Sequence, residues 1–301
     1  MSAWLLWPLV QYVNKEGPEQ VRESGVRSPQ LVEGRPEQVR ESDVNSSSVK
    51  SMEDKSILRG HPSYVWREGQ ERRLRMVRRW APLEGRRVLD VGCGLGMYTE
   101  ALSRYTPHVF GVEIELERAR EAWSQARARG VAVAPGEGLP FSDQSFDVVF
   151  NHEVLEHVKD DARMAAEMVR VCRAGGRVVT FCPNRWYPAE THGCYWRGSY
   201  SFGNKPLINY LPNPLRNRLA PHVRAYSGRG LRRLFGAQPV RVVHHGRVFA
   251  GYDNVVARWP RLGRWVQRVS YALESTPLQV LGLSHLLVVE RVDVELLRWH
   301  G

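Results

Sequence analysis

The 301-residue chain has few cysteines, few lysines and no long apolar run, and each shortage excludes a class of protein. Its four cysteines are widely separated and form no CxxC or Cys/His finger spacing, so we expect no disulfide framework and assign no metal site. No stretch reaches the roughly 20 consecutive apolar residues of a membrane-spanning helix. The apolar opening Met1–Val13 is too short for one and lacks the basic lead of a secretory signal. We therefore expect a cytoplasmic protein.

Lysine is scarce although the chain is basic: only five of the 43 basic residues are lysine, and the formal net charge is +11. Such a charge attracts anions, including nucleic acid and acidic lipid. The arginines, however, are spread through every segment, which indicates a composition bias of the whole chain. No aromatic stacking motif accompanies them, so we do not expect a nucleic-acid partner.

The first fifty residues differ from the rest of the chain. Residues 17–26 return almost unchanged as residues 35–44, in a polar context that contains proline. Such a segment cannot bury enough apolar surface to order itself, and two copies are too few for a solenoid. We expect residues 1–51 to be a disordered leader, with Met52 as a candidate for the true start, and residues 52–301 to be the folded domain.

Short apolar strands alternate with helices after an amphipathic helix within residues 62–80. The pattern predicts strands at 87–91, 108–113, 131–134, 146–151 and 177–182, and helices at 97–104, 116–129 and 160–172. Strands that alternate with helices in this way form a parallel sheet with helices on both faces. The fold class is therefore α/β, with a Rossmann-like, doubly wound sheet.

The alternation breaks at residues 183–226, which are crowded with Pro, Gly, Asn, Tyr and Trp. A structureless loop of this length is uncommon in a compact domain unless it has a function, so we interpret it as a cap over a substrate. A helix at 227–235, a strand at 240–247, a helical region at 260–274 and a last strand at 285–292 follow. They complete a mostly parallel, seven-stranded sheet with the cap inserted after the fifth strand.

A glycine-rich turn follows the first of these strands, in Val88-Leu-Asp-Val-Gly-Cys-Gly-Leu-Gly96. Glycines let the backbone approach a ligand closely, and Asp90 places a carboxylate beside it. Dinucleotide-binding folds use the spacing GxGxxG and direct a helix N-terminus at a pyrophosphate. Here the spacing is GxGxG and an acid precedes it, which would repel pyrophosphate and suits a cationic sulfonium amino acid. A nicotinamide-dependent oxidoreductase is therefore disfavoured.

Further polar residues follow the next strands, on the ligand side of such a sheet. Glu113 ends the second strand, where its carboxylate can accept hydrogen bonds from both hydroxyls of a ribose. Residues 136–141 follow the third strand, where an adenine would lie. Asn151 and His152 emerge at the end of the fourth.

The segment from about Val88 to Asn184 resembles the class I S-adenosylmethionine-dependent methyltransferases, and among them the type 11 methyltransferase-domain family. The matching pieces are VLDVGCGLG, GVE, LPFSDQSFDVVF, VLEHV and RVCRAGGRVVTFCPN, and the segment that contains them covers about a third of the chain. By position, the resemblance implies that S-adenosylmethionine is bound by Asp90, Gly92, Cys93, Gly94, Gly96, Glu113, Ile114, Glu137, Gly138, Asn151 and His152. One departure concerns the loop after the third strand, where family members often have an Asp and this chain has Pro135 and Gly136.

The resemblance implies a methyltransferase, and the acceptor that we expect is a small molecule or a lipid-like compound. Methyl transfer from a sulfonium is an in-line displacement that depends mostly on positioning, and a base is needed only if the nucleophile arrives protonated. The candidate catalytic residues are His192 and Glu190 in the cap, whereas we interpret His157 as structural. Two alternatives remain open: an RNA or protein methyltransferase, and a non-catalytic module that binds S-adenosylmethionine.

Overall fold

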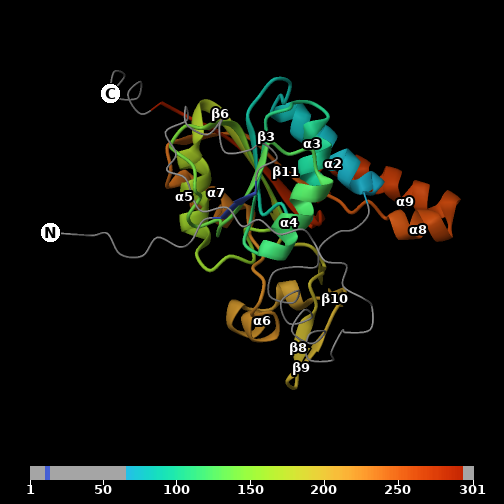
Figure 1. The fold of residues 1–301 in the computed structure, drawn as a ribbon. Coiled ribbons are helices and arrows are strands. Elements are labelled where there is room, and N and C mark those ends of the chain that lie inside the picture. Colours follow the sequence, from blue (N-terminus) through green and yellow to red (C-terminus); the bar gives the residue numbers. More distant parts are fainter. Residues whose placement is uncertain (1–10, 14–65, 294–301) are drawn as a thin grey trace, which may run out of the picture.

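The computed structural model describes residues 11–13 and 66–293, which build an α/β fold around one large sheet (Figure 1). The sheet has eight strands in the order β1-β4-β3-β2-β5-β6-β12-β11. Their bounds are β1 Gln11–Val13, β2 Val88–Val91, β3 Val109–Glu113, β4 Gly130–Val133, β5 Phe146–His152, β6 Cys172–Pro183, β11 Val240–Val248 and β12 Ser284–Arg291. Strands β4, β3, β2, β5 and β6 are parallel, and β12 is antiparallel to both of its neighbours.

The winding of the sheet fixes where a ligand can bind. From the central strand β2 the chain steps outward to β3 and β4, and then returns to the other side of β2 to form β5 and β6. In doubly wound sheets the loops diverge at such a reversal and leave a crevice at the carboxyl ends of the strands. The candidate crevice therefore lies beyond the ends of β2 and β5.

Helices cover both faces of the sheet because successive strand residues point in opposite directions. Val88, Val148 and Phe150 pack with helices α2 (Glu68–Trp80) and α3 (Met97–Ser103) on one face. Leu89 and Val149 pack with α5 (Asp161–Val171) and α7 (Gly228–Gly236) on the other. A smaller cluster joins α4 (Leu116–Gln125) to β4. The core is thus a three-layer sandwich.

The cap forms a separate lobe below the sheet in Figure 1. It contains strands β7 Ala189–Glu190, β8 Cys194–Trp196, β9 Ser199–Ser201 and β10 Lys205–Pro206, the 3-10 helix η3 Ile208–Tyr210 and helix α6 Asn213–Leu219. These strands make two short antiparallel ribbons, β7 with β10 and β8 with β9. The cap ends where it began, because Asn184 and Tyr226 form a parallel β-bridge at its base.

A second insertion separates β11 from β12. It consists of α8 Asp253–Arg258, α9 Pro260–Leu273 and the 3-10 helix η4 Pro277–Leu281. Helices α8 and α9 approach closely at Gly263, where an added Cβ would lie 2.5 Å from Val256 Cα. Within the described residues, no helix combines the length and the apolar character needed to cross a membrane.

The structure confirms the α/β class, the seven strands of the mostly parallel sheet and the helices between them. It differs at the amino-terminal edge, where Gln11–Val13 pairs antiparallel with β4 as an eighth strand although these residues fall in the expected disordered leader. Three residues carry too short a pattern to predict a strand. The rest of the leader, Met52 and residues 62–65 lie outside the described residues. Strand β6 also starts earlier than expected, because Cys172 pairs with Phe146 before a register shift.

We expect Asn184→Ala to destabilise the protein by about 2–3 kcal/mol, since this buried amide joins the base of the cap to η4. Its Nδ2 donates to the carbonyls of Val280 and Gly282, each at 2.7 Å, and its Oδ1 accepts from Trp186 N at 3.2 Å. Urea denaturation would measure the change. Exposed Asn217→Ala is the matched control, and equal stabilities of the two variants would contradict the assignment.

Candidate functional site

The turn between β2 and α3 contains three glycines with positive φ, at Gly92 (76°), Gly94 (55°) and Gly96 (85°). Two of them are required by packing: an added Cβ would lie 2.3 Å from Val154 Cγ2 at Gly92 and 3.0 Å from Ala122 Cα at Gly96. At Gly94 a Cβ would meet nothing within 4 Å. The backbone at Gly94 therefore borders open space at the crevice, where a ligand can approach it.

Asp90 lies at the floor of this turn with 2% of its surface exposed. Its Oδ2 accepts a hydrogen bond from Thr99 Oγ1 at 2.7 Å. Burial raises the pKa of Asp90 to about 7, and the charge of Glu113 adds to the effect while the Thr99 hydroxyl opposes it. A carboxyl group in this state ionises readily when a cation binds beside it.

Neighbouring Cys93 turns its side chain away from the crevice. Its Sγ packs under Gly111, where an added Cβ would lie 2.8 Å from the sulfur, and burial raises the pKa of the thiol well above its usual range. Any contact of Cys93 with a ligand would therefore come from its backbone.

Glu113 joins the end of β3 to the glycine turn. Its Oε2 accepts from Gly94 N at 2.9 Å, and its Oε1 accepts from Ile114 N at 2.9 Å and Glu115 N at 3.1 Å. A carboxylate offers about four lone-pair sites, so Oε2 retains one for a ligand hydroxyl. Ile114 beside it is 47% exposed and provides an apolar surface at the same edge.

The two residues predicted to contact adenine, Glu137 and Gly138, differ in whether they are free to contact a ligand. The Glu137 carboxylate accepts hydrogen bonds from Lys159 N (2.9 Å) and Asp160 N (3.4 Å) at the start of α5, so contact with a ligand would require those bonds to break. At Gly138 an added Cβ would meet nothing within 4 Å. The backbone at Gly138, rather than the side chain of Glu137, is therefore free to approach a ring.

Asn151 and His152 end β5, and Asn151 pairs with Val91 at the end of the adjacent strand β2. Asn151 is fully buried and its Nδ2 donates to Val91 O at 3.2 Å. The ring of His152 packs on Tyr98, with centroids 4.5 Å apart, and its Nε2 lies 2.6 Å from Arg73 Nη1. Burial and the charge of Arg73 lower the pKa of His152 to about 3. His152 is therefore a neutral acceptor that shapes the crevice.

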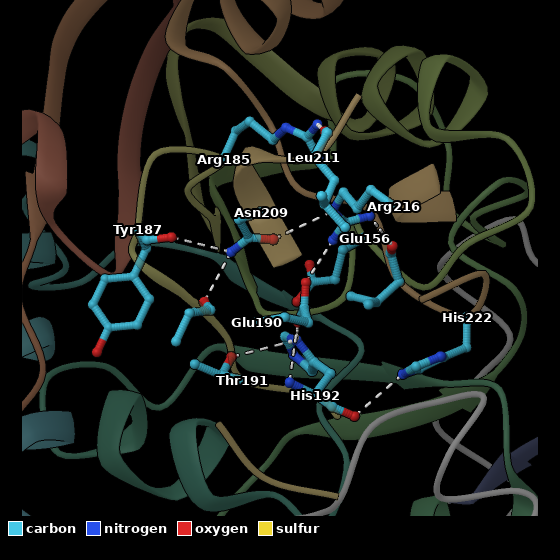
Figure 2. Close-up of polar contacts among 12 residues, drawn as sticks. Glu156, Arg185, Tyr187, Glu190, Thr191, His192, Asn209, Leu211, Arg216 and His222 are labelled. Carbon is cyan, nitrogen blue, oxygen red and sulfur yellow. Dashed lines mark hydrogen bonds and ion pairs between the residues drawn. The ribbon is translucent and has the colours of Figure 1, made fainter. Parts of the chain in front are cut away.

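The two candidate catalytic residues of the cap are joined to each other (Figure 2). Glu190 Oε1 lies 3.0 Å from His192 Nδ1, and Glu190 Oε2 accepts from Arg216 Nη2 at 2.6 Å. Glu190 and Arg216 are both at least 98% buried. Burial opposes ionisation, but the contacts with His192 and Arg216 outweigh it and lower the pKa of Glu190. Glu190 is placed to orient His192, and its burial does not favour the predicted role as a base.

One cluster brings in residues that were not predicted as a site. Glu156 and His157 precede α5, and their ligand atoms lie within 4.8 Å of those of His192. Glu156 is 1% exposed and neither of its carboxylate oxygens has a hydrogen-bond partner. Burial and the charge of nearby Glu153 raise the pKa of Glu156 well above its usual range. The adjacent residues Glu156 and His157 were the only hint of this cluster in the sequence. The third member, His192, lies in the cap, 35 positions after His157.

Comparison with known protein families identifies part of the chain. Residues 89–180 match the family model described as a methyltransferase domain. A ubiquinone biosynthesis O-methyltransferase of Rhizobium johnstonii is 34% identical over 135 residues, which are 44% of this chain and 52% of that protein. An uncharacterized methyltransferase of a Mycobacterium species is 46% identical over 96 residues, 32% of this chain and 38% of that protein. The chain thus spans about half the length of the first of these relatives.

Solved structures share the fold at low sequence identity. An S-adenosylmethionine-dependent methyltransferase of Mesorhizobium loti matches with a TM-score of 0.52 at 17% identity, covering 72% of this chain and 96% of that one. A cyclase matches with a TM-score of 0.51 at 16% identity, and the match covers 82% of this chain and 96% of the cyclase. Because proteins of different chemistry share it, the fold alone does not assign an activity.

We expect the stability contributed by Asp90 to fall as the pH rises from about 4 to about 7. The folded protein holds the Asp90 proton up to about pH 7, whereas the unfolded chain releases it near the ordinary pKa of 3.8. Stability is therefore fully present below that range and is lost through it, with a slope of at most about 1.4 kcal/mol per pH unit. Asp90→Asn removes this slope.

Urea denaturation of both proteins from pH 5 to pH 8 would measure the effect as the difference between their unfolding free energies. Exposed Glu117→Gln is the control and should run parallel to the wild type. If the difference in unfolding free energy between the wild type and Asp90→Asn does not change with pH, Asp90 is ionised in the folded protein over the whole range from pH 5 to pH 8.

Proposed function

We propose that the chain is an S-adenosylmethionine-dependent methyltransferase of class I and of the type 11 methyltransferase-domain family, since residues 89–180 match the model of a methyltransferase domain. The observation that carries the proposal is the crevice at the ends of β2 and β3. There a buried acid with a raised pKa, an open glycine backbone and an acid with a spare lone pair lie together, at Asp90, Gly94 and Glu113.

These residues fit the chemical groups of S-adenosylmethionine. Asp90 would ionise beside the cationic amino acid moiety, Gly94 leaves space for close backbone approach, and Glu113 would accept from a ribose hydroxyl. Exposed Ile114 and the open backbone at Gly138 would border the adenine. When bound, the cofactor supplies an electrophilic methyl group on a sulfonium.

The rival functions fit these residues less well. A nicotinamide dinucleotide would bring its pyrophosphate towards a turn whose neighbouring side chains are the acids Asp90 and Glu113. A non-catalytic module would need no cap with an ordered histidine. An RNA or protein methyltransferase remains the second candidate for the acceptor class, but the relatives' names support a small molecule.

We infer that the acceptor is a small molecule with a hydroxyl group, since several relatives are named O-methyltransferases of ubiquinone biosynthesis. His192 stands in the cap with its Nδ1 held by Glu190, and its side chain is 21% exposed. A histidine oriented in this way can take up the proton of an acceptor hydroxyl. Most of the rate enhancement would come from alignment of the two reactants between the crevice and the cap.

A lipid-like acceptor is favoured by the second insertion. Helix α9 and η4, with the residue that precedes α9, expose seven large apolar side chains: Trp259, Leu262, Trp265, Val269, Leu278, Val280 and Leu281. Exposed arginines alternate with them at Arg258, Arg261, Arg264 and Arg268, and α9 contains no acidic residue. A helix that carries tryptophan and arginine in this manner fits the interface of an anionic bilayer. Binding there would bring the crevice to a membrane-dissolved acceptor.

We expect S-adenosylhomocysteine to bind the full chain and Glu113→Gln to weaken that binding at least about tenfold, because the variant loses a charge-assisted hydrogen bond to the ribose. Isothermal titration calorimetry would measure both affinities. NAD should not bind.

Glu117→Gln is the matched control, since this exposed acid lies in the next helix and has no place in the crevice. Thermal unfolding of Glu113→Gln without ligand separates a local loss from a folding defect. Failure of the wild type to bind S-adenosylhomocysteine, or preference for NAD, would refute the proposed function.

We expect the full chain to co-sediment with phosphatidylglycerol vesicles, and replacement of Trp259 and Trp265 by Ser to lower the partition coefficient at least about tenfold through lost apolar burial. Trp196→Ser is the matched control, because this tryptophan is as exposed but lies in the cap ribbon. Equal sedimentation of all three proteins would exclude this surface as the membrane contact.

A further inference from the structure

A cluster of metal-ligand groups lies where the loop between β5 and α5 meets the cap. Glu156 and His157 come from the loop, and His192 comes from the cap between β7 and β8. One carboxylate oxygen and one nitrogen of each ring lie within 4.8 Å of one another. The cluster is closed on the side of the sheet and reaches solvent only at His192, since the side chains of Glu156 and His157 are 0% and 6% exposed.

Glu156 lacks a partner that would explain its burial. Neither carboxylate oxygen accepts a hydrogen bond from any of the described residues. A buried carboxylate that stays ionised is normally paired or bound to a metal, so a cation bound at this cluster would supply the partner that Glu156 lacks.

Both histidines are oriented for metal binding. His157 Nδ1 lies 3.3 Å from the carbonyl of His222, which can only accept, so Nδ1 carries the proton and Nε2 presents a lone pair. That Nε2 lies 4.0 Å from Glu156 Oε1. His192 Nδ1 lies 3.0 Å from Glu190 Oε1, and Glu190 Oε2 accepts a hydrogen bond from Arg216 Nη2 at 2.6 Å. Metal-binding histidines almost always donate their second ring nitrogen to a carboxylate or a carbonyl, as both of these do.

We propose that Glu156, His157 and His192 bind a divalent transition-metal ion, through one carboxylate oxygen and the Nε2 atoms of the two rings. Two imidazoles and one carboxylate are a ligand set for Zn²⁺, Co²⁺ or Fe²⁺, whereas Mg²⁺ prefers oxygen ligands and its own waters. Three protein ligands leave a coordination position open. The exposed side of His192 is where a further ligand can enter.

The open position has a role in catalysis, which rests on the proposed methyltransferase function. An acceptor hydroxyl whose oxygen binds the metal loses its proton more easily, because the ion stabilises the oxyanion. The proton passes to solvent, a bond forms between that oxygen and the transferred methyl carbon, and the carbon–sulfur bond breaks to leave a neutral thioether. His192 then acts as a metal ligand, and the base predicted from the sequence is not needed.

The test is a titration of the metal-free full chain with Co²⁺, without cofactor or acceptor. Co²⁺ reports its coordination through visible absorption, and we expect saturation at one ion per chain and a higher melting temperature. Substitution of a ligand, in Glu156→Gln, His157→Gln or His192→Gln, should weaken binding more than about tenfold. His108→Gln is the control, since this residue lies at the opposite, amino-terminal end of β3.

Glu156→Gln separates metal binding from folding, because it replaces an unpaired buried acid by a neutral group of the same shape. We expect this variant to fold at least as stably as the metal-free wild type and to gain nothing from Co²⁺. Absence of saturable binding to the wild type, or unchanged binding in all three variants, overturns the site.

The metal site and the proposed function can fail separately. Metal binding without affinity for S-adenosylhomocysteine would keep the site and refute the methyltransferase. Affinity for S-adenosylhomocysteine together with methyl transfer that is undiminished after removal of the metal by a chelator would keep the methyltransferase and refute the catalytic role of the ion.

Discussion

The cap depends on one buried ion pair. Glu190 and Arg216 meet in its interior, and the Arg216 guanidinium also donates to Asn209 Oδ1 and the carbonyl of Val223. Through these contacts a strand, a 3-10 helix, a helix and the returning chain are fixed in a lobe that has little apolar core of its own. Loss of one partner of such a pair typically costs about 3–5 kcal/mol, because the other charge stays buried. The same pair holds His192 in place, so the stability of the cap and the geometry of its reactive groups have a common origin.

The sequence predicted what depends on local pattern. Alternation of short apolar strands with helices located the sheet, and the turn after Val91 located the crevice, because glycines at alternate positions are seldom needed unless the backbone turns tightly or meets a ligand. The sequence pattern could not predict contacts between residues that are far apart in the chain. Glu190 was predicted to be a base because the pattern could not show Arg216 beside it, and Glu137 was predicted to be a ligand group because its partner, the start of α5, is 22 positions away. Glu156 was passed over, since nothing in a VLEHV segment indicates that its carboxylate is buried without a donor.

The two halves of the candidate site are built on different principles. The crevice at β2 and β3 uses backbone groups and carboxylates at the ends of paired strands of the sheet. The cap instead presents side chains on short ribbons. A neighbour of the same fold is a cyclase, so the shared sheet alone does not determine the chemistry.

The base of the cap has a further implication. Its two ends are joined by the bridge between Asn184 and Tyr226, where Arg185 N donates to Tyr226 O and Tyr226 N donates to Pro183 O. A segment that leaves and re-enters a fold at one point can be lengthened, shortened or exchanged without moving the strands on either side. The cap can therefore be replaced, in evolution or by engineering, to change which molecule is accepted while the strands of the sheet keep their register.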